Sequence, residues 1–194
     1  MDFLASDILI NSDIIISQET NLHSVRHVNY DNLGQVGWFG LNLSTTDSGE
    51  YCRGSLIATN TNNGIPKPVK IKIGDTESKF DIRAASISFS NETVIFISAY
   101  RSPSMSDLEC IEFFDHLTAV ITEFTGKIIL VGDLNIASHR PFRYGLTENI
   151  FLDTISKSGL DSKFTGPTRE SIQLDYAFSN FGVNVGYGLS LIHI

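Results

Sequence analysis

The sequence predicts one α/β domain with mixed strand directions, and three observations support this. Short apolar runs of strand length, such as Val94–Ile97 and Ile128–Val131, alternate with two segments of helical periodicity. At 194 residues, the chain can bury one sizeable core and does not need a second. Hydrophobic residues make up 42% and charged residues 19%, which is typical of globular proteins and excludes a fibrous or disordered chain. The apolar runs are too short to span a bilayer.

The net charge limits how the chain can bind nucleic acid. The net charge is −8, with a pI of about 5.0. Binding through bulk electrostatics requires many lysines and arginines, so this mode is disfavoured. An enzyme that holds a cation among carboxylates and meets DNA briefly remains compatible with the charge. The two cysteines, Cys52 and Cys110, are expected to be reduced thiols of an intracellular protein.

The first half of the chain is expected to be rich in strands. Asp13–Ser17 is an apolar, β-branched run typical of a strand buried on both faces. Residues 51–60 predict a second strand, in which Gly54 suggests a bulge or a close backbone approach. Val69–Ile73 alternates strictly and predicts a strand with one buried face, after a loop over residues 65–68.

A hairpin and a capped helix are expected next. Phe80–Phe89 and Thr93–Tyr100 flank a Ser-Asn-Glu turn and predict two antiparallel strands. Ser106 and Glu109 have the capping-box spacing. The apolar residues that follow recur at helical intervals and end at Gly126, a candidate for the C′ position: Leu108, Ile111, Phe114, Leu117, Ile121 and Phe124.

The last third alternates strand and helix. Lys127–Gly132 predicts a central strand, and Thr147–Ser158 predicts a second helix closed by Gly159. Ile172–Phe178 predicts the last strand.

Polar residues stand where several of these strands end, and open α/β sheets gather their sites at the carboxyl ends of strands. They are Glu19, the pair Tyr100-Arg101, the segment Gly132-Asp133-Leu134-Asn135, and the segment Leu174-Asp175-Tyr176. Each alone also fits a turn residue, a core-edge tyrosine or a surface arginine. Asp133 and Asn135 are the sharpest pair, because residues two apart on an extended segment point the same way.

Together and in this order, the four segments resemble the endonuclease/exonuclease/phosphatase superfamily, which includes DNase I and the apurinic/apyrimidinic endonucleases. The strings SQETNL, ISAYRSPS, IILVGDLNIASH and PTRESIQLDYAFS are most similar to the endonuclease domains of non-LTR retrotransposons. The resemblance covers roughly Asp13 to Phe178. It implies a DNase I-like, four-layered α/β sandwich of two packed mixed sheets flanked by helices.

The resemblance also implies site roles. Glu19 would bind Mg²⁺, or Mn²⁺ in its place, and Asp133 would orient or deprotonate the attacking water. Asn135 would bind the scissile phosphate, and Tyr100 would donate to that phosphate or to the leaving oxygen. Asp175 would orient a catalytic histidine.

Further residues are expected to hold the substrate: Arg101, Thr168 and Arg169. The substrate implied by the resemblance is DNA, nicked in the nucleus by a protein that also carries a reverse transcriptase downstream.

The chain departs from the family pattern at both ends. The family's terminal S-D-H segment is missing, and residues 189–194, LSLIHI, match the translation of a transposase sequencing adapter. We expect residues 1–188 to form an incomplete domain, with 189–194 as adapter read-through. The family's first strand, which would precede a helix expected over Met1–Ser12, is not visible either. A chain without these segments is expected to be nearly inactive.

Two other functions stay open. The chain could be a stand-alone phosphodiesterase or phosphatase of the same superfamily, because a fold does not fix a substrate. It could also be a decayed, non-catalytic remnant, which the acidic balance and the missing segments favour. The joint presence of all five residues with implied roles argues against decay.

Overall fold

A computed structural model of the chain describes residues 14–18, 26–33, 36–42, 55–60, 66–69, 79–89, 92–136, 145–163, 166–168 and 173–183. For residues 26–33, 36–42, 60 and 145–148, the description is limited to the backbone. Within these ranges, no helix combines the length and the apolar character needed to cross a membrane.

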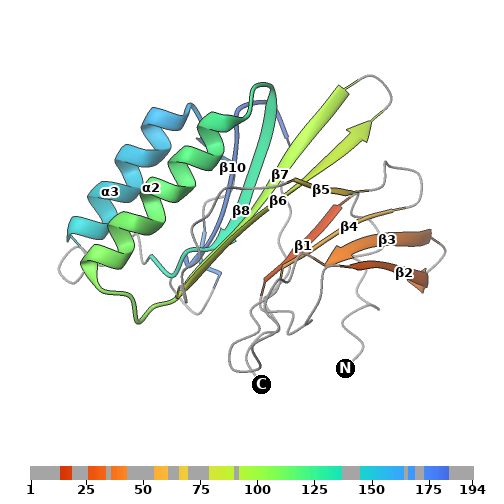
Figure 1. Cartoon of the computed structure of the whole chain (residues 1–194), viewed down its shortest axis with the longest axis horizontal. Coiled ribbons are helices and arrows are strands. Elements are labelled where there is room, and N and C mark those ends of the chain that lie inside the picture. The colour runs from red at the N-terminus through yellow and green to blue at the C-terminus, as the bar shows by residue number, and fades with distance from the viewer. Residues whose placement is uncertain are drawn as a thin grey trace.

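The larger sheet has six strands in the order β5-β6-β7-β8-β10-β9. Its strands are β5 (Lys67–Val69), β6 (Phe80–Phe89), β7 (Glu92–Arg101), β8 (Lys127–Asp133), β9 (Asp161–Ser162) and β10 (Asp175–Ser179). The sheet is mixed, because β7 and β8 are parallel and the other neighbours are antiparallel. The two helices, α2 (Asp107–Glu123) and α3 (Gly145–Ser158), lie side by side over one face of it (Figure 1).

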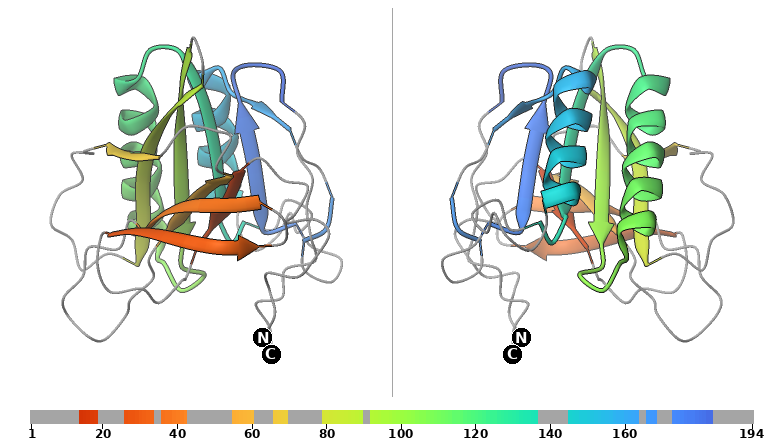
Figure 2. Two further views of the ribbon diagram at one scale, coloured as in Figure 1. Left: turned by 90° about the vertical axis from the view of Figure 1, so that its right-hand side faces the viewer. Right: turned by 90° about the vertical axis from the view of Figure 1, so that its left-hand side faces the viewer.

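The smaller sheet packs on the opposite face of the larger one. Its four strands are antiparallel in the order β1-β4-β3-β2, with the bounds β1 (Ile14–Ser17), β2 (Arg26–Leu33), β3 (Val36–Asn42) and β4 (Leu56–Asn60). Figure 2 shows β2 and β3 running across the strands of the larger sheet on one side, and both helices covering it on the other.

Two hydrophobic cores result from this layering. The core between the larger sheet and the helices includes Ile97, Phe113 and Leu130. The core between the two sheets includes Ile57, Ile87 and Phe96. Successive side chains of a strand point to opposite faces, so the long strands β6, β7 and β8 of the larger sheet each supply both cores.

The strands confirm much of the predicted order and correct its details. The hairpin β6–β7 and the strand β8 lie where they were expected. The strand predicted over Val69–Ile73 instead begins at Lys67 and includes Pro68, which an edge strand tolerates because one row of its N–H groups needs no ladder partner. The residues of β1 are only half-buried, not buried on both faces as predicted. In the described part of the smaller sheet, β1 is an edge strand.

The helices also follow the prediction in part. Ser106 caps α2 with a complete capping box, as predicted. The cap at the other end is Phe124 in an extended conformation, so Gly126 is not at C′. Phe114, Leu117 and Ile121 are buried as predicted, whereas Leu108 is 78% and Ile111 36% exposed. The buried stripe also includes Cys110, Phe113 and Val120.

The second helix, α3, is followed by Gly159 at φ 67°, which agrees with the predicted termination. Three strands were not predicted: β2, β3 and β9. The helix expected over Met1–Ser12 and the glycine at position 54 lie outside the described residues.

Candidate active site

Three of the predicted site residues occupy one row across the larger sheet. In the parallel pair β7–β8, Tyr100 lies opposite Asp133. In the antiparallel pair β8–β10, Asp133 lies opposite Asp175. Residues directly opposite each other share a face and have Cβ atoms about 4.5–5.5 Å apart in antiparallel pairs. Tyr100, Asp133 and Asp175 therefore come together, although 75 residues separate the first from the last.

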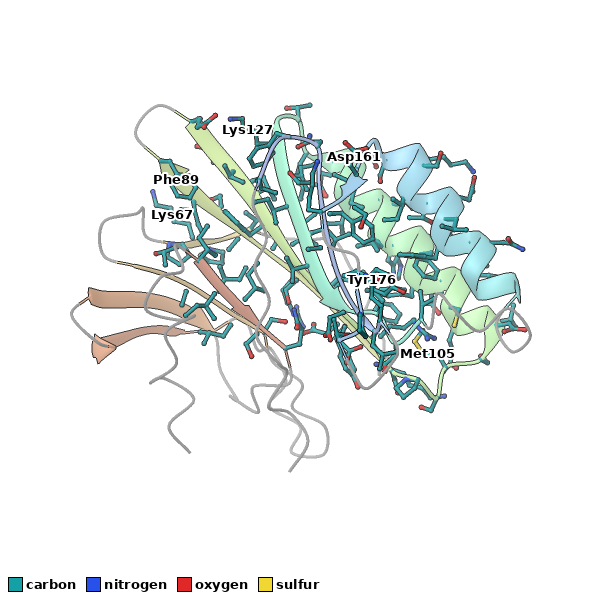
Figure 3. All side chains as sticks on the ribbon, turned by 180° about the vertical axis from the view of Figure 1, so that it is seen from behind. Lys67, Phe89, Met105, Lys127, Asp161 and Tyr176 are labelled. Carbon is teal, nitrogen blue, oxygen red and sulfur yellow. The ribbon has the colours of Figure 1, made fainter. Side chains whose placement is uncertain are left out.

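The row lies on the face that looks toward the smaller sheet. Val94 and Phe96 of β7 belong to the core between the sheets, and strand alternation gives Tyr100 the same side. Tyr100 is 7% exposed. Figure 3 labels Tyr176, which follows Asp175, at the end of the sheet opposite Lys127 and Phe89. The row thus sits at one end of the layer between the two sheets.

Asp175 lies at a different end of its strand from Tyr100 and Asp133. Tyr100 and Asp133 lie at the carboxyl ends of parallel strands, as expected. Because β10 runs antiparallel to β8, Asp175 is its first residue, not its last. The prediction of a strand from Ile172 to Phe178 placed this residue mid-strand. The described strand begins at Asp175 itself.

The segment after β8 turns sharply. The strand ends at Asp133, and Asn135 has a φ of 50°. The backbone N–H of Asn135 donates to Oδ1 of Asp133 at 3.1 Å, the local side-chain-to-backbone bond of an Asx turn. The prediction of an extended segment from Asp133 to Asn135 is therefore wrong. The two residues are joined by a hydrogen bond and not by strand alternation.

This turn orients both functional groups. The bond from Asn135 restricts rotation of the Asp133 carboxylate. The Asn135 side chain donates through Nδ2 to the carbonyl oxygen of Arg101 at 2.8 Å. A side-chain amide has two N–H groups, and the second makes no hydrogen bond with the described residues. It can donate to a substrate oxygen.

Gly132 is required by the packing of the parallel strands. A Cβ atom at this position would overlap the carbonyl oxygen of Ala99, its neighbour in β7, and lie 2.9 Å from the carbonyl carbon. Only glycine lets the two strands approach this closely. The glycine that precedes Asp133 thus has a structural reason independent of any chemistry.

A polar network that the sequence did not reveal lies beside the row. Gln18 donates to Ser98, Ser98 donates to Ser55, and Ser55 donates to Oδ2 of Asp81, at 3.1, 3.1 and 3.3 Å. Asp81 lies opposite Tyr100 in β6 and forms an ion pair with Arg83 at 2.7 Å. The alternation Asp-Ile-Arg in a strand places both charges on one face and could have indicated this pair.

The network indicates where the chain runs just before Glu19, which itself lies outside the described residues. Gln18 directly precedes it and reaches Ser98, two residues before Tyr100 on the same face. The chain therefore leaves β1 beside the row. The position of the Glu19 side chain stays a prediction.

Two residues predicted to hold substrate have other partners. Arg101 is only 2% exposed, and its guanidinium donates to carbonyl oxygens of the segment after β8. Phosphate binding by Arg101 does not fit this burial. The hydroxyl oxygen of Thr168 accepts the backbone N–H groups of Leu174 and Asp175, at 2.9 and 3.1 Å, and so fixes the start of β10. Arg169 lies outside the described residues.

The donor chemistry of the row suits a hard divalent cation. Asp133 and Asp175 are carboxylates on neighbouring strands, and like charges placed opposite each other repel unless a cation lies near them. Mg²⁺ prefers oxygen ligands and keeps several of its waters, so it needs few protein groups. The described residues contain no cluster of three acidic, histidine or cysteine ligands. Glu19 is the predicted further ligand.

Comparison with known proteins establishes the fold of the chain. No family model and no curated protein matches the chain. Among solved structures, it is similar to the endonuclease domain of TRAS1, a telomere-specific non-LTR retrotransposon, at 17% identity over 88% of this chain and 73% of that chain, with a TM-score of 0.57.

Two further solved structures are similar. The human nocturnin catalytic domain gives 13% identity over 89% of this chain and 70% of that chain, with a TM-score of 0.59. D. rerio TDP2 complexed with a single-strand DNA product gives 13% identity over 89% and 72%, with a TM-score of 0.52. The resemblance seen in the sequence is thereby confirmed for the fold: this chain has the DNase I-like α+β fold of the endonuclease/exonuclease/phosphatase proteins.

Proposed function

We propose that this chain is a Mg²⁺-dependent DNA endonuclease domain, of the kind that non-LTR retrotransposons encode ahead of a reverse transcriptase. The observation that carries the proposal is the row of Tyr100, Asp133 and Asp175, with Asn135 hydrogen-bonded to Asp133. The fold shared with the TRAS1 endonuclease domain supports it. The DNA product bound to D. rerio TDP2 supports DNA as a substrate for this fold.

The side chains of the row suit in-line hydrolysis of a phosphodiester. Asp133, which accepts a hydrogen bond from the Asn135 N–H, would orient the attacking water and accept its proton. The second N–H of the Asn135 amide and the Tyr100 hydroxyl would donate to phosphate oxygens where negative charge develops. Asp175 would orient a histidine from the S-D-H segment that the family carries.

Glu19 and the carboxylates of the row would hold Mg²⁺ or Mn²⁺. When bound, the cation supplies positive charge beside the scissile phosphate. The net charge of −8 leaves little electrostatic attraction for DNA, so a basic neighbouring domain of the parent protein would supply affinity.

Nicking of supercoiled plasmid tests the proposal. It should be measured with Mg²⁺ and with EDTA, for the 194-residue chain and for a completed chain, to which the family's first strand and its S-D-H segment have been added. The completed chain should nick DNA only with the divalent cation. Asp133→Asn should reduce the rate by about 10²–10⁴-fold, because the amide cannot accept a proton. The matched control is Asp153→Asn on the exposed face of α3, which should retain the rate.

A panel of other substrates separates the alternatives. Abasic DNA, poly(A) and inositol phosphates should be cleaved more slowly than plasmid DNA. Preference for one of them would identify a stand-alone phosphodiesterase or phosphatase instead. A completed chain that hydrolyses none of them would be a non-catalytic remnant, and the proposal would be wrong.

A further inference from the structure

Arg101 is a buried charge that has no carboxylate partner among the described residues. It is one of the largest fully buried side chains in the described structure, at 2% exposure. A buried charge is costly unless its hydrogen bonds are made. Its Nε donates to the carbonyl oxygen of Leu134 at 2.5 Å, and its Nη2 donates to that of Asn135 at 2.7 Å. Its Nη1 lies 3.2 Å from Sγ of Cys110.

The two carbonyl groups that Arg101 binds are consecutive. Along an extended strand, consecutive carbonyl groups point in opposite directions, so one side chain reaches both only where the chain turns. The turn is made by Asn135 at φ 50°, a left-handed conformation that costs free energy in residues other than glycine. Asn135 in turn donates its side-chain amide to the Arg101 carbonyl oxygen. The two residues therefore hold each other in place.

A second side chain completes the support. The hydroxyl of Tyr176, in β10, donates to the carbonyl oxygen of Ile136 at 2.5 Å. Leu134 also donates its N–H to the carbonyl oxygen of Leu174 at 3.0 Å. The segment Leu134–Ile136 is thus held from β7 on one side of β8 and from the β10 region on the other.

We propose that Arg101 is a positioning residue that fixes the turn after β8 and, through it, the directions of the Asp133 carboxylate and the Asn135 amide. The proposal deepens the proposed function, since the groups it fixes are those assigned to hydrolysis. The guanidinium suits this task because it is planar and presents several donors in a rigid fork. Lysine offers one compact charge and cannot reproduce two donors at that spacing.

Substitution of Arg101 by Lys and by Met tests the proposal. Backbone hydrogen exchange at Leu134 and Asn135, measured by NMR on the 194-residue chain, should rise by about 10-fold or more relative to exchange in β8. In the completed chain, kcat should fall by about 10²-fold with KM for DNA little changed, because the reacting groups are misplaced while DNA contacts remain. Lysine should not rescue either property.

Two controls separate positioning from general destabilisation. Val120 of α2 is 2% exposed, so Val120→Ala removes buried side-chain atoms from the core. It should leave hydrogen exchange at Asn135 and kcat near the wild-type values. Cys110→Ala removes the contact at Nη1 but keeps both donors to the turn, so it should retain the protection of Asn135.

The two proposals can fail separately. If Arg101→Lys keeps wild-type exchange at Asn135, or if Val120→Ala matches its effects, the positioning role is wrong. If the wild-type completed chain cleaves nothing while Arg101→Lys still releases the turn, the proposed function fails and the positioning of the turn stands.

Discussion

Single residues around Asp133 show how packing fixes the position of this carboxylate at the end of β8. Gly132 allows β7 and β8 to approach, and a side chain there would meet backbone atoms of Ala99. Backbone atoms cannot rotate away as a flexible side chain would. The register that puts Tyr100 opposite Asp133 therefore depends on a residue with no side chain.

We predict that Gly132→Ala lowers the free energy of unfolding by about 1–3 kcal/mol, the usual cost of adding a methyl group to a packed interior. The matched control is Gly182→Ala, since a Cβ atom there meets nothing within 4 Å. The control should stay within about 0.5 kcal/mol of wild type in urea denaturation. Equal stability of the two variants would mean that the strands are not this close.

Some single residues could be predicted from the sequence, and others could not. Asp133, Tyr100 and Asp175 stand at strand ends, where short motifs reveal them. Arg101 was expected at the surface or on a phosphate, because arginine is rarely fully buried. Its partners are backbone carbonyl groups 33 and 34 residues away, and side-chain type carries no information about them.

Among the elements, helix α2 depends on its first turn. Glu109 accepts hydrogen bonds from the backbone N–H and hydroxyl of Ser106 at 2.6 and 2.8 Å, and pairs with Lys79 at 3.0 Å. The Ser106 backbone N–H, then its hydroxyl, then Lys79 lower the pKa of Glu109 from 4.5 to about 2. The carboxylate form is the one that stabilises the helix start.

This shift predicts a pH dependence of stability. Since the folded pKa lies below the ordinary value, the stabilisation is complete above pH 4.5 and is lost as the pH falls toward about 2. Glu109→Gln should lower the urea midpoint above pH 4.5, and the difference from wild type should shrink across that window. Glu112→Gln on the same helix is the control, and an identical pH profile for both variants would contradict the assignment.

Local sequence patterns predicted where helices and strands lie better than they predicted which face of each element is buried or which element it packs against. The capping box and Gly159 mark helix ends because capping is a local interaction. The buried face of α2 was predicted only in part: Phe114, Leu117 and Ile121 are buried, whereas Leu108 and Ile111 are apolar but exposed. Strands β2 and β3 were missed because they contain Asn, Asp and Gly, which are depleted in strands.

At the scale of the whole molecule, polar side chains lie at one end of the hydrophobic core between the two sheets. The core between the sheets gives way, toward one end, to the network of Gln18, Ser98, Ser55 and Asp81. The row with Asp133 begins there. The layering was implied by the family resemblance, whereas the polar network needed the three-dimensional pairing of four distant segments.

The central claim is that Asp133 and its neighbours in the row form a divalent cation site. Titration with Mn²⁺, followed by NMR, tests it most directly, because the paramagnetic ion broadens the resonances nearest to it. We predict that the amide signals of Tyr100, Asp133, Asn135 and Asp175 broaden first, that excess Mg²⁺ restores them, and that Glu19→Gln weakens the effect. Broadening centred on the exposed acids of α2 or α3, with the row unaffected, would contradict the account.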